Sequence, residues 1–201
     1  MNLDDLLSMD KESVPQAAKA LTQDDLHRLV ALLDEKNDKL RYPAFLLLQS
    51  RSDFADDVYP FFDVFANKLK SEHSYQRSIG LMLTAQNARW DTLGKLDAAM
   101  DDYLNCIHDE KPVTVRQCIQ SLLHILPYKK SLHQKIAQAL MKMDITALRP
   151  TMRKLVLLDI LQVLLQIRQH TSKSAIDAYI FDALSGGILD DKSKKQIKKA
   201  L

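Results

Sequence analysis

Residues that interrupt regular secondary structure are scarce in this sequence. Only 4 glycines and 6 prolines occur among its 201 residues, whereas average usage is roughly 7% and 5%. An all-β domain, or a chain with long loops, needs more of these residues at its turns. Their scarcity therefore predicts an all-α fold.

The sequence also has few cysteines and a small net charge. Cys106 and Cys118 are the only cysteines, which is too few for a disulfide framework and fits a reducing compartment. The 28 basic and 26 acidic residues give a formal charge of +2, far from the basic excess of a dedicated nucleic-acid binder. The start, MNLDDLLSMDKES, has three acids before any base and does not resemble a secretory signal. We therefore expect a cytoplasmic protein.

The sequence lacks an apolar run of the length that crosses a membrane. Its most apolar stretch, 155–167, is interrupted by Asp159 and Gln162 and is shorter than the ~20 residues that a bilayer requires. The stretch predicts a buried helix and no membrane span.

What the sequence does contain is an internal repeat of helix, turn and helix. Four similar segments align on an arginine with spacings of 36, 39 and 37 residues: Arg41, Arg77, Arg116 and Arg153. The last large apolar residue before each turn recurs with spacings of 36, 38 and 36 residues: Leu33, Leu69, Ile107 and Met143. Periods of this size are typical of stacked helical repeats, so we predict an α–α superhelix of about four to five helical pairs.

Between the turns, apolar residues recur with the helical period. Three such faces are Leu26, Leu29, Val30 and Leu33; Met100, Tyr103, Leu104 and Ile107; and Leu132, Ile136, Leu140 and Met143. Helix starts are predicted at Thr22, Asp91 and Ser131, whose side-chain oxygens can accept hydrogen bonds from unpaired backbone N–H groups. We expect a single repeat domain over 1–201, with an N-terminal cap over 1–21, repeats over 22–185 and a basic end over 186–201.

The turn into the second helix of each pair resembles that of the HEAT-repeat superfamily, in which an aspartate and an arginine recur. Asp38 precedes Arg41 and Asp109 precedes Arg116, whereas Ser74 stands three residues before Arg77. The resemblance covers residues 22–185 and implies a HEAT-like solenoid.

Two longer segments, SYQRSIGLMLTAQNARWD over 74–91 and DEKPVTVRQCIQSLLHILPYK over 109–129, resemble a group of short bacterial HEAT-like proteins of unknown activity. Some of these proteins carry an iron–sulfur assembly (SufBD) label. A cluster scaffold is normally held by several thiolates, and this chain has two cysteines. We therefore expect no cofactor.

The four repeated arginines have two interpretations. Repeats place equivalent side chains in a row, so they would line a concave groove that binds phosphates or carboxylates. Alternatively, they form an internal ladder in which each arginine pairs with an acid at a turn, such as Asp38 or Asp109. The ladder is favoured because partly buried arginines usually need fixed partners.

The candidate binding surface lies where one repeat passes into the next. It contains Trp90, the only tryptophan, beside Asn87 and Asp91, and tryptophan is enriched at binding hot spots. A lone tryptophan more often packs into a corner between helices. Stacking would bring residues one repeat further along beside this turn, so the predicted surface comprises Arg77, Asn87, Trp90, Asp91, Lys111, Arg116 and Gln117.

A group of potential zinc ligands lies within nineteen residues: Cys106, His108, Cys118 and His124. On helices, however, Cys106 and His108 would point about 200° apart and Cys118 and His124 about 240° apart. We therefore expect buried thiols, surface histidines and no metal site.

The C-terminal segment is rich in lysine and carries two apolar residues, Ile197 and Leu201. Such a basic amphipathic segment fits contact with nucleic acid, a membrane surface or a protein partner. A solvated end-cap helix is the favoured interpretation.

The sequence contains no Gly-rich phosphate loop, no GxSxG elbow and no HExxH motif, which favours a non-catalytic protein. The leading hypothesis is a protein-interaction scaffold whose concave surface grips a protein or peptide. The alternative is a nucleic-acid-binding or DNA-repair protein, because the chain is also loosely similar to HEAT-like alkylpurine DNA glycosylases. Such glycosylases use a tryptophan-lined, arginine-rich concave face and an aspartate, so that resemblance implies these roles for Trp90, Asp91 and the repeated arginines.

Overall fold

The structure, a computed structural model, describes residues 3–170 and 174–201. These residues form α-helices and short 3₁₀ turns, and no β-strand is found among them. The all-α prediction is confirmed.

The chain divides into two compact units, Met1–Met100 and Asp101–Leu201, and α7 (Lys95–Asn105) runs across the boundary. The other helices of the first unit are α1 (Leu3–Leu7), α2 (Val14–Lys19), α3 (Gln23–Leu32), α4 (Asp38–Ser52), α5 (Phe62–Lys68) and α6 (Ser74–Gln86). The other helices of the second unit are α8 (Pro112–Ile125), α9 (His133–Met141), α10 (Pro150–Arg168), α11 (Ser174–Ser185) and α12 (Asp191–Lys199).

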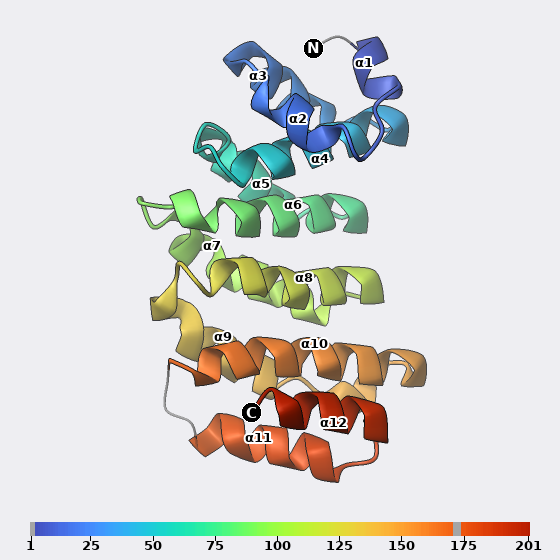
Figure 1. Cartoon of the computed structure of the whole chain (residues 1–201), viewed down its shortest axis with the longest axis vertical. Helices are drawn as coiled ribbons and strands as arrows, with labels where there is room; N and C mark the ends of the chain where they lie inside the picture. Colours follow the sequence, from blue (N-terminus) through green and yellow to red (C-terminus); the bar gives the residue numbers. More distant parts are fainter. Residues whose placement is uncertain (1–2, 171–173) are drawn as a thin grey trace. The chain divides into compact units, whose positions relative to one another are not determined.

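In the first unit, helices consecutive in sequence pack as pairs. Helix α3 packs against α4 and α5 against α6, while α4 also contacts α6 (Figure 1). Helices α1 and α2, which fall in the predicted N-terminal cap, both contact α4. Leu26 and Leu29 of α3 join Leu47 and Leu48 of α4 in one buried core.

Gly80 allows α5 and α6 to approach closely. A Cβ atom at Gly80 would lie 2.8 Å from the carbonyl oxygen of Phe65 and 3.0 Å from the Cβ of Lys68. Contacts this short with backbone do not occur in packed proteins, so the position requires a residue without a side chain. The α5–α6 pair therefore depends on this glycine.

In the second unit, α10 is the central helix. It contacts α8, α9 and α11, and its residues Val156, Ile160, Val163, Leu164 and Ile167 are buried. The predicted buried helix over 155–167 lies within α10, which confirms that prediction. None of the described helices is long and apolar enough to cross a membrane.

The two sequence registers correspond to equivalent places in the helical pairs. The buried apolar residues stand at or just after the ends of α3, α5, α7 and α9: Leu33, Leu69, Ile107 and Met143. The repeated arginines lie near the starts of α4, α6, α8 and α10: Arg41, Arg77, Arg116 and Arg153. All members of the three predicted apolar faces are buried. The helix, turn and helix pattern is therefore confirmed in these segments.

Two of the three predicted helix-capping residues act as caps. The Thr22 side chain accepts a hydrogen bond from the Asp25 backbone N–H, and the Asp25 carboxylate accepts one from the Thr22 N–H, which makes a capping box at the start of α3. The prediction for Ser131 is wrong, because Ser131 lies inside a 3₁₀ turn and Leu132 occupies the cap position of α9 without a side-chain hydrogen bond. Asp91 is described with the site.

Candidate functional site

Three of the repeated arginines hold the turn that precedes their own helix. Arg41 donates from Nη1 to the Glu35 carbonyl oxygen at 3.0 Å and forms an ion pair with Asp38. The Nη1 of Arg77 donates to the carbonyl oxygens of Ser71 and Glu72, at 2.7 and 2.9 Å. In the same way Arg153 donates to the carbonyl oxygens of Leu148 (2.9 Å) and Thr146 (2.6 Å). These contacts match the ladder interpretation, and they show that Arg77 and Arg153 also bind backbone oxygens of the turn, whereas the ladder was expected to use acids.

Arg116 makes a different contact, which joins two helices. Its Nε and Nη2 donate to the two carboxylate oxygens of Asp159 on α10, at 2.6 and 3.1 Å. Gln120 donates to the same carboxylate at 2.9 Å, and Asp159 is only 5% exposed. The hydrogen bonds that Arg116 donates to Asp159 raise the pKa of the Arg116 guanidinium. Arg116 therefore pairs with a partner that lies 43 residues away in sequence, whereas the pairing expected from the turn was with Asp109.

The corner around Trp90 ties the end of α6 to the end of α4. Asn87 is fully buried and donates from Nδ2 to the Leu83 carbonyl oxygen and the Ser52 hydroxyl. The Trp90 indole, in the 3₁₀ turn Asn87–Trp90, donates to the Ser52 carbonyl oxygen at 2.8 Å. The Arg89 guanidinium lies 4.5 Å from the centre of the Trp90 ring system. Trp90 is thus partly buried in a corner that joins two helices.

Asp91 is buried and fixes the start of α7. Its carboxylate accepts hydrogen bonds from the backbone N–H groups of Lys95 and Leu96, both at 2.9 Å. Asp91 thus caps α7 as predicted, although the helix begins at Lys95 and not directly after Asp91. It also accepts one from the Tyr59 hydroxyl at 2.6 Å. Burial, and then the hydrogen bond to Asp91, raise the pKa of Tyr59 to about 12.

The remaining candidates lie on or beside α8 in the second unit. Lys111 is exposed in the cap position of α8, 3.3 Å from the Glu110 carboxylate. The Oε1 atom of Gln117 is buried and has no hydrogen-bond partner among the described residues. Arg77, Asn87, Trp90 and Asp91 belong to the first unit. That the two groups form one surface therefore stays a prediction.

The two cysteines are buried and form no disulfide bond. Cys106 lies in the 3₁₀ turn Cys106–His108 and Cys118 on α8, and burial raises the pKa of Cys118 well above its usual value. His108 and His124 are exposed. Within residues 3–170 and 174–201, no group of three or more His, Cys, Asp and Glu side chains is arranged to hold a metal ion.

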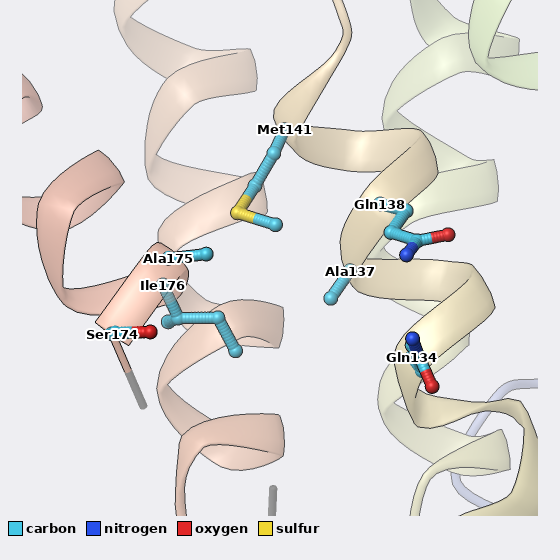
Figure 2. A pocket seen from close by; sticks show the side chains of 7 residues that line it. All are labelled: Gln134, Ala137, Gln138, Met141, Ser174, Ala175 and Ile176. Carbon is cyan, nitrogen blue, oxygen red and sulfur yellow. The ribbon is translucent and has the colours of Figure 1, made fainter. Parts of the chain in front are cut away.

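An open groove lies between α9 and α11 in the second unit. It has a volume of about 420 Å³ and is lined by Gln134, Ala137, Gln138, Met141, Ser174, Ala175 and Ile176. Figure 2 shows Ala137 and Met141 of α9 facing Ala175 and Ile176 of α11. Ala137 and Ile176 are buried at its floor, whereas Gln134, Gln138 and Ser174 are exposed. None of the described residues that line it is ionisable, so this part of the groove is suited to holding apolar groups.

Sequence reasoning missed this groove. The α9 residues at positions 134, 137, 138 and 141 follow an i, i+3, i+4, i+7 spacing and share one helix face. That face combines glutamine, alanine and methionine, so it is neither a core stripe nor a charged surface. Only the placement of α11 beside α9 turns it into a groove.

Comparisons of the chain with protein-family models, with curated proteins and with solved structures give no match.

Proposed function

We propose that the chain is a HEAT-like helical solenoid that binds another protein and catalyses no reaction. The observation that carries this proposal is the α9–α11 groove, whose described lining consists of apolar and small polar side chains and amides and includes no acid or base. Proton transfer in catalysis uses titratable side chains, whereas apolar grooves with a polar rim are typical of recognition sites.

The solenoid part of the proposal is supported by packing within each unit. The second helices of successive pairs contact one another, α4 with α6 and α8 with α10. In both units the apolar register falls at the ends of the first helices of the pairs, and the arginine register falls near the starts of the second helices. Stacking of equivalent helices is the defining feature of a repeat solenoid.

The groove is suited to an apolar anchor residue of a partner protein. Met141 forms part of its wall, and the flexible thioether side chain adapts to different partner shapes. Gln134 and Gln138 on the rim offer amide donors and acceptors to a partner backbone. An amphipathic helix or an extended segment with a large apolar side chain fits this combination.

The alternative function, nucleic-acid binding or base repair, has less support. Base repair of the glycosylase type would require a carboxylate free to act at a substrate, and the Asp91 carboxylate is buried and engaged by Tyr59, Lys95 and Leu96. The Trp90 indole N–H is likewise bonded to Ser52. Retention of duplex DNA that weakens steeply with added salt would favour this alternative, and a salt slope near zero would exclude it.

A cytoplasmic location is part of the same proposal. Cys106 and Cys118 are both buried and form no disulfide bond. Proteins of oxidising compartments usually join their cysteines in disulfides. Two cysteines without a disulfide therefore support a reducing compartment.

Site-specific photo-crosslinking in cells tests the proposed function. A photoreactive amino acid at Gln138, on the groove rim, should capture a partner protein in a discrete band. The same amino acid at Gln23, exposed at the start of α3 in the first unit, serves as the control. If Gln138 gives no crosslinked protein above the Gln23 background, the proposal is wrong.

A further inference from the structure

Positive charge is concentrated in the last helix of the chain. Residues 186–201 contain five lysines and two aspartates, which gives this segment a formal charge of +3. The whole chain has a formal charge of +2, so the remaining residues sum to −1. The positive field is therefore local to α12 (Asp191–Lys199; Figure 1).

The lysines of α12 share the side that faces away from the protein. Ser193 and Ile197 are the buried residues of this helix. At ~100° per residue, the five lysines span an arc of about 160° that is centred opposite these two residues. They are Lys192, Lys194, Lys195, Lys198 and Lys199. All except the partly buried Lys194 are exposed.

The stability of the helix does not account for these lysines. Only Lys198 and Lys199 lie in the last turn, where the helix dipole favours a positive charge, whereas Lys192 lies in the first turn, where the dipole opposes it. Lys192 and Lys195 are three residues apart and Lys195 and Lys199 four, so like charges repel along the face. None of the five has an ion-pair partner among the described residues, and Asp190 at the helix cap pairs with Lys154 instead.

The properties of this face favour a short acidic polypeptide over other polyanions. The face carries no arginine and no aromatic side chain, which nucleic-acid sites use for phosphate forks and base stacking. The apolar side of α12 is buried through Ile197 and is not available for insertion into a bilayer. Nine residues at 1.5 Å each make the face about 14 Å long, which matches a few carboxylates and not an extended nucleic-acid backbone.

We propose that the outward lysine face of α12 is a second docking surface, which binds an acidic segment of a partner protein by charge complementarity. This inference rests on the proposed function as an interaction protein, but it concerns a surface separate from the α9–α11 groove. Binding relieves the repulsion among the lysines and is weakened by salt.

The test measures fluorescence anisotropy of a labelled twelve-residue peptide of alternating glutamate and serine, titrated with the full chain. The triple variant K192Q/K195Q/K198Q should weaken binding at least tenfold, and K192R/K195R/K198R should retain it. The matched control K19Q/K36Q/K130Q removes three exposed lysines elsewhere, and thus the same net charge, and should change affinity less than twofold. Circular dichroism checks that all variants remain folded.

Two results would overturn this inference. Equal effects of the α12 variant and the control would show that net charge alone governs binding. Tighter binding of duplex DNA or phosphatidylserine vesicles than of the peptide, with loss on the α12 substitution, would assign the face to another class of partner. The variant Ala175→Trp fills the groove and leaves α12 unchanged. If this variant still binds the peptide, the peptide does not bind in the groove, and the α12 surface is tested independently of the proposed function of the groove.

Discussion

The Arg116 guanidinium on α8 donates two hydrogen bonds to the Asp159 carboxylate on α10, from Nε at 2.6 Å and from Nη2 at 3.1 Å. Arg116 is one of the four repeated arginines and belongs to the predicted binding surface. Its partner is almost completely buried, so the pair joins two helices of the second unit. The same side chain that suggests recognition in the sequence thus has a structural role.

Replacing Arg116 alone should destabilise the second unit. The variant Arg116→Met leaves the buried Asp159 carboxylate without its cation, at a cost of about 2–3 kcal/mol. The double variant R116M/D159L removes both charges and should be more stable than R116M alone, because no unpaired carboxylate remains. Urea unfolding followed by circular dichroism measures both, and a double variant less stable than R116M would contradict the pairing.

Gly80 should not tolerate alanine although alanine is the better helix former. Alanine gains about 1 kcal/mol of intrinsic helix propensity, but its Cβ would meet the Phe65 carbonyl oxygen at 2.8 Å. The expected net result is a loss of about 1–2 kcal/mol. Gly187→Ala is the control, because a Cβ there meets nothing within 4 Å. A Gly80→Ala protein as stable as the wild type in urea would show that α5 and α6 are less closely packed.

The helical pairs could be predicted from sequence because their signals are local. Leu33, Leu69, Ile107 and Met143 recur at the repeat period, and each is buried where the first helix of a pair ends. Thr22 was predictable for the same reason, since its capping partner Asp25 lies three residues away. The prediction that Ser131 caps a helix was wrong because a 3₁₀ turn spans Lys130–Leu132 and α9 begins only after it, at His133.

The site could be predicted only in part, because its contacts join residues that are distant in sequence. Asp159 stands in a largely apolar run, and nothing local indicates that Arg116, 43 residues earlier, is its partner. Trp90 was expected either in a corner or at a binding surface, and its bond to the Ser52 carbonyl oxygen places it in a corner. The groove depends on how α11 lies against α9, and no single helix carries that information.

Stability should fall at high pH partly through Tyr59. The folded state raises the pKa of this hydroxyl to about 12, above the ordinary value near 10. Its stabilising contribution is fully present below about pH 10 and is lost as the pH rises to about 12. The measurement is the difference in unfolding free energy between the wild type and Tyr59→Phe, which separates this residue from the five other tyrosines of the chain. That difference should shrink between pH 10 and 12, and a constant difference would contradict the assignment.

Charge reversal in α12 should have opposite effects at its two ends. Lys192→Glu places an anion in the first turn and should stabilise the fold by about 0.5 kcal/mol, while Lys199→Glu does the reverse in the last turn. Both variants change the net charge by the same amount, so the helix dipole accounts for the difference between their thermal midpoints. If Lys192→Glu proved as destabilising as Lys199→Glu, the helix dipole would not oppose a positive charge at Lys192. The argument that helix stability does not account for this lysine would then fail.

Loss of partner binding on filling the groove tests the central claim most directly. The variant Ala175→Trp places an indole in the α9–α11 groove, whereas Ala178→Trp makes the same change on the same helix at an exposed position outside the groove lining. In affinity capture from cells, the proteins retained by the wild type should be retained by Ala178→Trp and lost with Ala175→Trp. Equal retention by the two variants would show that the groove is not the binding surface.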